Sequence, residues 1–213
     1  MTEQISEPMG EVRIYAASLT DDDAGRLHGA WIECDGKTGD EIRAEIVAML
    51  AASPTARASG EIAEEWAIHD FEVPDWIPRS MVGESTSPDT FAALADLAGL
   101  ADESPHYRAG LALWLDCCGR NGGEICADEA RDWIDDAYLG ESQYGAAGWA
   151  EESLDDQGLF NGVSQMLRQY FDFEAYARDL ISSGDVDFVT EGGDAIGHRD
   201  AGDSRQVYVF SCQ

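Results

Sequence analysis

Charge is the feature that most limits how this chain can fold. The sequence carries 43 acidic residues against 13 basic ones, a formal net charge of -30, and Lys37 is its only lysine. A charge this large repels itself and destabilises any compact state. It is also spread along the chain: residues 1–83 hold 17 acidic and 6 basic side chains, residues 84–124 hold 7 and 2, and residues 125–213 hold 19 and 5. Because the acids are interleaved with apolar residues, we expect folded elements that display them at fixed positions.

The same charge limits the partners of the chain. A strongly anionic protein is not expected to bind nucleic acid directly or to bind an anionic membrane surface. The N-terminal residues lack the basic start and apolar run of a signal peptide, and no stretch approaches the ~18 apolar residues of a membrane span. Five cysteines, an odd number, then indicate reduced thiols. We therefore expect a cytoplasmic protein whose partners are cations or proteins with basic grooves.

Alternating apolar residues predict a small α+β unit in residues 1–83. Strands are expected at 12–18, 30–34 and 64–74, from their β-branched and aromatic content. Residues 19–29 and 53–60 are expected to be an exposed turn and a polar loop. Between them Thr38 and Glu41 fit a capping box, which predicts a helix with one apolar face formed by Ile42, Ile46, Met49 and Leu50.

The rest of the chain is expected to be a helical segment followed by a second α+β unit. Helices should begin at Ser87-Pro88 and at Pro105. Beyond residue 125, the last apolar segment is expected to be a helix that ends at Gly184. It is followed by an expected antiparallel pair of strands, 186–190 with 206–210. The predicted fold class is α+β, as an elongated chain of three small domains with an acidic surface: residues 1–83, 84–124 and 125–213.

Metal-binding and catalytic motifs are absent from the sequence. The acidic loop that starts at Asp185 fails the EF-hand pattern, and Cys117, Cys118 and Cys126 lack the paired spacing of a zinc site. There is no nucleophile elbow, phosphate loop or zinc-protease helix. We expect no metal, no cofactor and no catalytic residues. A hydrolase that uses a pair of carboxylates stays open as an alternative, because 43 acids offer many pairs.

The stretch from Asp128 to Gln143 places acids and apolar residues on opposite sides of a predicted helix. Asp128, Asp132, Asp135 and Asp136 share one face, where like charges four residues apart destabilise the helix. A similar acidic row runs from Glu151 to Asp156. For one helix, a solvated face is the simpler interpretation, but repetition in every part of the chain favours a surface that presents negative charge. At one charge per ~1.7 Å of duplex, two copies of the chain would match ~100 Å of DNA, about 30 base pairs.

Four blocks of sequence, in order, resemble the ArdA-type antirestriction proteins. They are residues 13–34, with Gly29-Ala30-Trp31, and residues 64–74, 133–141 and 170–180. The resemblance implies a non-enzymatic protein that mimics bent B-form DNA. It would inhibit type I restriction-modification enzymes by occupying the DNA-binding groove of the methyltransferase core, and would form a homodimer through its C-terminal region. Relative to that family, 53–60 and 191–205 look like extra length.

This interpretation assigns two sets of residues. An antirestriction region with a possible dimer contact comprises Trp133, Ala137, Tyr138 and Gly140. The acids expected to face the partner are Asp21, Asp22, Asp23, Asp70, Glu72, Asp75, Asp128, Glu129, Asp132, Asp135, Asp136, Glu141, Glu151, Glu152, Asp155 and Asp156.

One further alternative remains besides the hydrolase. A halophilic protein also has an acidic surface with few lysines, and its folding would improve in molar salt without affinity for basic proteins.

Overall fold

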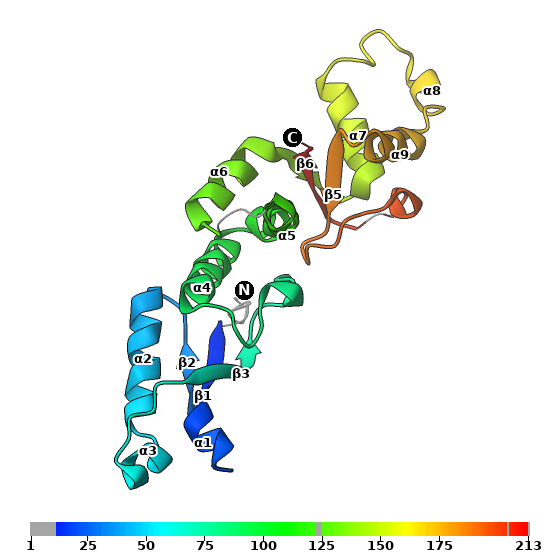
Figure 1. The fold of residues 1–213 in the computed structure, drawn as a ribbon. Helices are drawn as coiled ribbons and strands as arrows, with labels where there is room; N and C mark the ends of the chain where they lie inside the picture. The colour runs from blue at the N-terminus through cyan, green and yellow to red at the C-terminus, as the bar shows by residue number, and fades with distance from the viewer. Residues whose placement is uncertain (1–11, 122–124, 204, 213) are drawn as a thin grey trace, which may run out of the picture. The chain divides into compact units, whose positions relative to one another are not determined.

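The computed structural model describes residues 12–121, 125–203 and 205–212. It contains helices and two three-stranded antiparallel sheets (Figure 1), which confirms the predicted α+β class. The described chain separates into two compact units. Unit 1 holds the described residues up to Glu103 together with Leu115–Ala130, and unit 2 holds Ser104–Trp114 together with the described residues from Arg131 onwards. The division into three domains stays a prediction.

The sheet of unit 1 has the strand order β2-β1-β3. The strands are β1 (Arg13–Ser18), β2 (Gly29–Glu33) and β3 (Trp66–Glu72), so all three predicted strands are confirmed. Register along β1 fixes its faces: Ile14 pairs with Ile32, whereas Tyr15 pairs with Trp31. Ile14 and Ile32 are buried and Trp31 is exposed. One face of this sheet therefore forms core and the other faces outward.

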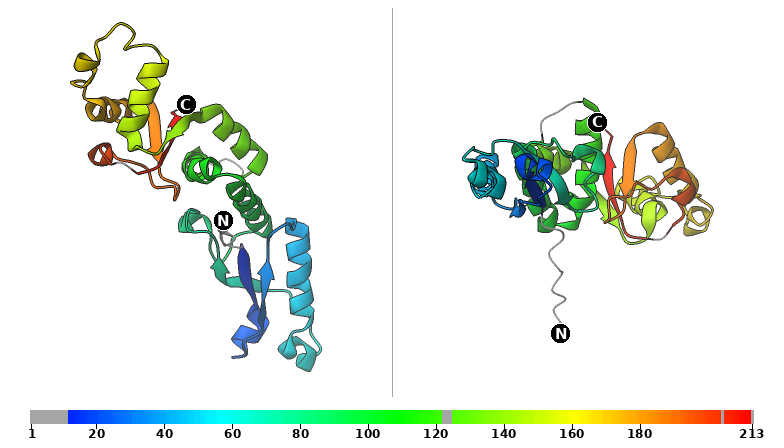
Figure 2. Two further views of the ribbon diagram at one scale, coloured as in Figure 1. Left: turned by 180° about the vertical axis from the view of Figure 1, so that it is seen from behind. Right: turned by 60° about the horizontal axis from the view of Figure 1, so that its bottom comes forward.

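Helix α2 (Gly39–Ala51) lies along this sheet, as Figures 1 and 2 show from opposite sides. The capping box at its start is confirmed: Glu41 N donates to Thr38 Oγ1 at 3.3 Å, and Thr38 N donates to Glu41 Oε2 at 2.8 Å. All four residues of the predicted apolar face are buried. The 3.6-residue period thus identified the face that packs against the strands.

Two short helices replace predicted connections in unit 1. Helix α1 (Leu19–Asp23) follows β1, and α3 (Pro54–Ser59) occupies the segment expected to be a polar loop. That loop prediction was wrong. Ser53 Oγ accepts from Ala56 N at 3.1 Å, Pro54 stands at the first helical position, and Gly60 ends the helix with φ 77°. This is the same Ser-Pro start that the sequence shows at 87–88.

Helices α4 (Pro88–Glu103) and α5 (Pro105–Asn121) begin where they were expected. Ser87 Oγ accepts from Thr90 N at 3.2 Å and so caps α4. The α4 side chains Phe91, Leu94 and Leu97 are fully buried. A single turn of 3-10 helix, η1 (Arg79–Met81), precedes them.

The sheet of unit 2 has the order β4-β6-β5, with β4 (Tyr138–Ser142), β5 (Val186–Val189) and β6 (Val207–Ser211). Pairing of β5 with β6 confirms the predicted antiparallel pair. Strand β4 was not predicted: α6 (Ala127–Ala137) ends at Ala137 and the chain enters a strand at the next residue. Strand β6 is central, and no side chain from Val207 to Phe210 is more than 5% exposed.

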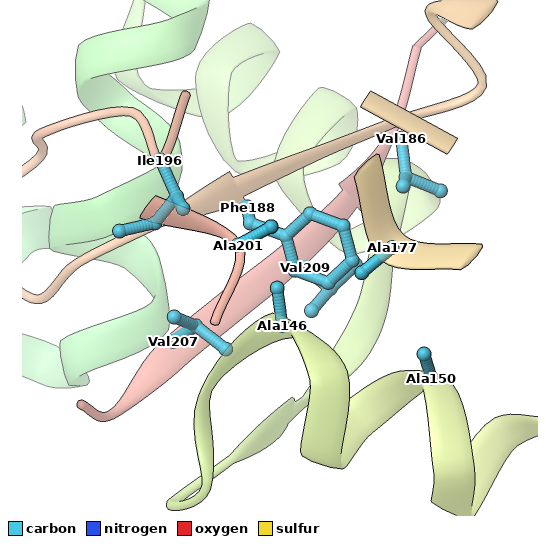
Figure 3. Packing of buried hydrophobic residues seen from close by; sticks show 9 residues of the cluster. All are labelled: Ala146, Ala150, Ala177, Val186, Phe188, Ile196, Ala201, Val207 and Val209. Atoms are coloured by element: carbon cyan, nitrogen blue, oxygen red, sulfur yellow. The ribbon is translucent and has the colours of Figure 1, made fainter. Parts of the chain in front are cut away.

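One face of the unit 2 sheet is covered by α7 (Gly145–Asp156) and α9 (Phe173–Ser183). Figure 3 shows the resulting cluster, in which Phe188 and Val209 of the sheet meet Ala146 and Ala177 of the helices. Between α7 and α9 the chain makes only the four-residue helix α8 (Gln165–Arg168). Gly184 ends α9 with φ 73°, as expected for a left-handed cap. The 3-10 turn η2 (His198–Asp200) also contacts α9.

The opposite face of this sheet is covered by the unit 2 parts of α5 and α6. Gly110 of α5 faces Ile134 and Phe210 so closely that an added Cβ would lie 2.9 to 3.0 Å from their side chains. Tyr138 stacks on His106, with ring centroids 4.7 Å apart, and lies 5.6 Å from the Phe210 ring. Burial lowers the pKa of His106 and raises that of Tyr138 to about 12. Both rings are therefore neutral at pH 7.

Within the described ranges, no helix combines the length and the apolar character that crossing a bilayer requires.

Candidate functional site: the exposed carboxylates

Fourteen of the sixteen acids predicted to face a partner are exposed. Glu151 is half-buried and Asp21 is buried. Eight of the sixteen belong to each unit, so each unit carries its own acidic set. In unit 1 they lie on α1, on β3 and the residues after it, and on the first turn of α6. In unit 2 they lie on the rest of α6, on β4 and on α7.

Asp21 is a correction to the predicted set. Its side chain is 0% exposed, so its carboxylate cannot be presented to a partner. Oδ1 accepts from Thr55 N at 2.9 Å and thereby ties α1 to α3. Burial alone would raise the pKa of Asp21, but hydrogen bonds from Ser53, Thr55 and Ser18 outweigh it and hold that pKa well below its usual value. Asp21 is a structural carboxylate, and the sequence Asp21-Asp22-Asp23 gave no sign of which of the three points inward.

Helix α6 separates its acids from its apolar residues, as its sequence predicted. Asp128, Asp132, Asp135 and Asp136 are exposed, whereas Ala130, Ile134 and Ala137 are fully buried. The only partner found for this acidic face among the side chains described is the Tyr107 hydroxyl, which donates to Asp135 at 3.0 Å. The four carboxylates of this α6 face therefore remain almost entirely free to interact with a partner.

Three other acids of the predicted set are held by arginines of the same unit. Glu72 accepts from Arg13 Nε at 2.6 Å, and Arg168 pairs with Glu151 at 2.9 Å and with Asp155 at 2.5 Å. These contacts take up part of the local charge. For the remaining exposed members, the described side chains provide no ion pair. They are Asp22, Asp23, Asp70, Asp75, Asp128, Glu129, Asp132, Asp135, Asp136, Glu141, Glu152 and Asp156.

The predicted antirestriction region packs mainly inside unit 2. Ala137 is 0% exposed, which rules out a direct contact of its side chain with a partner and corrects that assignment. Trp133 and Tyr138 are half-buried, and Tyr138 makes the ring contacts with His106 and Phe210. Gly140 lies at an irregularity in the β4–β6 pairing and has φ 132°, a backbone conformation that favours glycine.

A group of exposed apolar side chains in the connection between α7 and α9 was not predicted from the sequence. We call this cluster the apolar patch. It holds half of the exposed large hydrophobic residues found in the described chain, within 13 positions. Its members are Leu159, Val163, Met166, Leu167, Tyr170 and Phe171. A signal was present in the sequence: residues 157–171 contain no Asp or Glu, whereas a stretch of that length would carry about three at the average of 43 acids in 213 residues.

The described side chains offer little for metal chemistry. Over residues 12–121, 125–203 and 205–212, no group of three or more His, Cys, Asp or Glu is placed to hold a metal ion. Cys34, Cys126 and Cys212 are free thiols, and burial raises the pKa of Cys34 to about 12. The side chains of Cys117 and Cys118 lie outside the described part.

Comparison with known families gives a match over most of the chain. The family model described as "Antirestriction protein (ArdA)" matches residues 14–194, from β1 to the segment after β5. No curated protein matches the chain. The family match spans far more than half of the 213 residues, including both sets of exposed acids. The chain therefore belongs to the ArdA family of antirestriction proteins.

Proposed function

We propose that this antirestriction protein mimics B-form DNA and inhibits type I restriction-modification enzymes by occupying the DNA-binding groove of their methyltransferase core. The observation that carries the proposal is the row of exposed, largely unpaired carboxylates on α6. A groove that grips phosphates is lined with Lys and Arg, and such side chains bind carboxylates by the same charge-assisted hydrogen bonds.

The charge density of α6 supports the comparison with DNA. The helix carries five acids in 11 residues. At 1.5 Å per residue, that is one acid per ~3.3 Å of axis. One strand of a DNA duplex carries one phosphate per ~3.4 Å. Four acids on the 12-residue α7 give one per ~4.5 Å. Helix α6 thus matches the charge density of one strand, whereas on α7 Arg168 pairs with Glu151 and Asp155 and leaves Glu152 and Asp156 unpaired among the described side chains. The opposite side of both helices is packed.

In this proposal the protein is an inhibitor without catalytic residues or cofactor, and it acts as a homodimer. Association would release counterions from both partners, so the affinity should fall steeply with salt. Because the binding free energy is spread over many exposed charges, each single carboxylate should matter little. Exposed ion pairs contribute ~0.2–1 kcal/mol each.

Competition with DNA tests the proposal. The measurement is displacement of a labelled DNA duplex from a type I methyltransferase at 50 and 200 mM salt, together with inhibition of methylation and of ATP-dependent cleavage. The variant Asp132→Asn/Asp136→Asn should inhibit several-fold less than the unaltered protein. The matched control, Glu64→Gln/Glu65→Gln, removes the same charge from two exposed residues outside the predicted set and should retain inhibition.

Three outcomes would contradict the proposal. Failure of the protein at large excess to displace DNA or to affect either activity would exclude occupation of the groove. Complete loss of inhibition when a single Asp or Glu of this protein is substituted would instead indicate a catalytic carboxylate. Stabilisation in molar salt without any inhibition would favour the halophilic alternative.

A further inference from the structure

A pocket at the surface of unit 2 lies between β4 and α7, which contact each other. Its volume is about 310 Å³, at the small end of the ~300–1,000 Å³ range of ligand pockets. Three carboxylates line it: Glu141 of β4, and Glu152 and Asp156 of α7. All three are exposed, and none of the described side chains forms an ion pair with them. The pocket therefore combines a hollow with negative charge that the described part of the chain does not pair.

One wall of this pocket is aromatic. The side chains of Trp149 and Leu139 line it, and the Trp149 ring packs edge-on against Phe188 of the buried cluster, with ring centroids 5.5 Å apart. Gly140 also lines the pocket and has φ 132°. A Cβ added to Gly140 would lie 3.6 Å from the indole Nε1 of Trp149. A side chain at position 140 would therefore lie against the indole, where glycine leaves room.

The same helix shows which group such an arrangement binds. Helix α7 carries two pairs of carboxylates, each with a spacing of four residues. The pairs are Glu151 with Asp155, and Glu152 with Asp156. Arg168 binds the first pair, at 2.9 Å from Glu151 and 2.5 Å from Asp155, and its guanidinium also lies 5.3 Å from the Phe160 ring centroid. The second pair has the Trp149 indole beside it and, among the described side chains, no arginine.

We infer that the pocket between β4 and α7 binds an arginine side chain of the protein partner. In this arrangement the guanidinium stacks on the Trp149 indole and donates to Glu152 and Asp156, as Arg168 does with Phe160 and the first pair. Glu141 adds a third negative charge. The inference rests on the proposed function and names a side chain that the inhibited enzyme presents.

A metal ion or a lysine fits this pocket less well than an arginine. Across the described ranges, no group of three or more His, Cys, Asp or Glu is placed to hold a metal ion, so the three carboxylates do not converge on one. A lysine ammonium is a compact, strongly hydrated point charge, whereas the planar guanidinium donates in two directions and stacks on aromatic rings. The pocket should therefore distinguish arginine from lysine.

Such a pocket fixes the position of the partner along the acidic surface. The exposed carboxylates of α6 attract any cation within the ~8–10 Å over which salt screens charge, so they tolerate a shift of the partner. A pocket instead takes one side chain in one place. Loss of the pocket should therefore weaken binding more than loss of the same charge from α6.

NMR of the chain with 15N-labelled tryptophan tests the pocket directly. The variant Trp149→Phe identifies the Trp149 indole signal among six. The probe is the peptide acetyl-Gly-Arg-Gly-amide, compared with acetyl-Gly-Lys-Gly-amide at low salt. The arginine peptide should shift the Trp149 signal to saturation, and the lysine peptide should shift it at least about fivefold less at equal concentration. The Trp31 signal is an internal control and should move little, because Arg13 already lies 4.9 Å from that ring centroid.

The pocket variant Glu152→Gln/Asp156→Asn removes the carboxylate pair and should reduce the shift at least about fivefold. The matched control Glu64→Gln/Glu65→Gln removes two exposed acids from unit 1 and should leave the shift unchanged. In displacement of DNA from a type I methyltransferase, half-displacement should require at least tenfold more of the pocket variant than of the unaltered protein. That loss should exceed the loss caused by the α6 variant.

The outcomes separate this inference from the proposed function. Equal shifts with the arginine and lysine peptides, no saturable shift, or an undiminished shift in the pocket variant would each overturn the arginine pocket. DNA displacement by a protein with any of these results would leave the mimicry intact. Displacement by the pocket variant as efficient as by the control overturns the assignment of the pocket to the enzyme. An arginine-selective shift in a protein that displaces no DNA overturns the proposed function alone.

Discussion

The two sheets of the molecule have the same number of strands, but their outer faces differ. In unit 1 the face that carries Tyr15 and Trp31 is open, with Trp31 41% exposed. In unit 2 the central strand β6 is buried on both faces, between α7 and α9 on one side and the Gly110 region of α5 with Ile134 on the other. An antiparallel sheet can expose one face to water, whereas a strand covered on both sides must be apolar throughout.

The sequences of the central strands record this difference. β1 reads RIYAAS, with charged and aromatic residues on its open side, and β6 reads VYVFS, with four consecutive buried residues. On the open face Arg13 lies between Glu33 and Glu72 and stacks 4.9 Å from the Trp31 ring centroid. Long side chains there cover apolar surface while their charged ends stay in water. A residue of the central strand in unit 2 should therefore contribute more to the free energy of unfolding than a residue of the central strand in unit 1.

The largest expected effect compares Phe210 with Trp31. Phe210→Ala leaves a cavity between β6 and α5 and should lower the free energy of unfolding by about 3–5 kcal/mol. Trp31→Ala removes an exposed ring with its Tyr15 and Arg13 contacts and should lower it by about 1 kcal/mol. Urea unfolding followed by circular dichroism measures both. Equal losses would mean that the open face is covered in solution.

A pH-dependent effect is expected from Asp21, the buried charge of unit 1. Because the pKa of Asp21 is lower in the folded state than in the unfolded chain, the folded protein binds fewer protons there. Its contribution to stability is therefore present above about pH 4, the unfolded value, and is lost as the pH falls further. Asp21→Asn should lower the urea midpoint at pH 7 and reduce the difference between pH 7 and pH 3.

The control for this substitution is Asp22→Asn, one residue on and exposed. It should leave the midpoint at both pH values nearly unchanged. Identical pH profiles for the two variants would contradict a structural role for the Asp21 carboxylate.

The smallest effect is expected on the open face itself. Arg13→Gln removes the pairs with Glu72 and Glu33, and exposed pairs contribute only ~0.2–1 kcal/mol. The loss should shrink when salt increases, because those charges are screened. Unfolding of Arg13→Gln at 50 and 500 mM NaCl checks this. A larger loss that does not depend on salt would show that the Arg13 stem, packed on Trp31, matters more than its charge.

Much of the fold could be predicted from local sequence. Helix ends were predicted at the capping box of Thr38, at the Ser-Pro start at residue 88 and at Gly184. Each of these signals acts within one helical turn, so it can be recognised without the rest of the chain. Strand β4 was not predicted from the sequence, because Tyr138–Ser142 follows the acidic helix directly. Its strand conformation depends on pairing with β6, nearly 70 residues later. Helix α3 was predicted as a polar loop, although its Ser-Pro start is the same signal that identified α4.

The candidate site was predictable in composition and less so in detail. Exposure of the α6 acids followed from the helical period, but the orientation of Asp21 depends on the backbone of Thr55, 34 positions away. The apolar patch was visible as an acid-free stretch, yet apolar residues at such spacing fit a core equally well. Only the tertiary structure shows that the rings of Phe160 and Phe173 are half-buried against Phe171, while Leu167 and Tyr170 stay exposed.

By itself the sequence determined the sign and spread of the charge, the α+β class, most helix ends and the family, because composition, periodicity and capping are local properties of a chain. Tertiary structure alone decided that one sheet is open and the other enclosed, that Asp21 is interior, and that Leu167 and Tyr170 are left outside. Whether a side chain is buried depends on which distant segment of the chain packs against it. The free energy gained by that burial is therefore not predictable from the local sequence pattern.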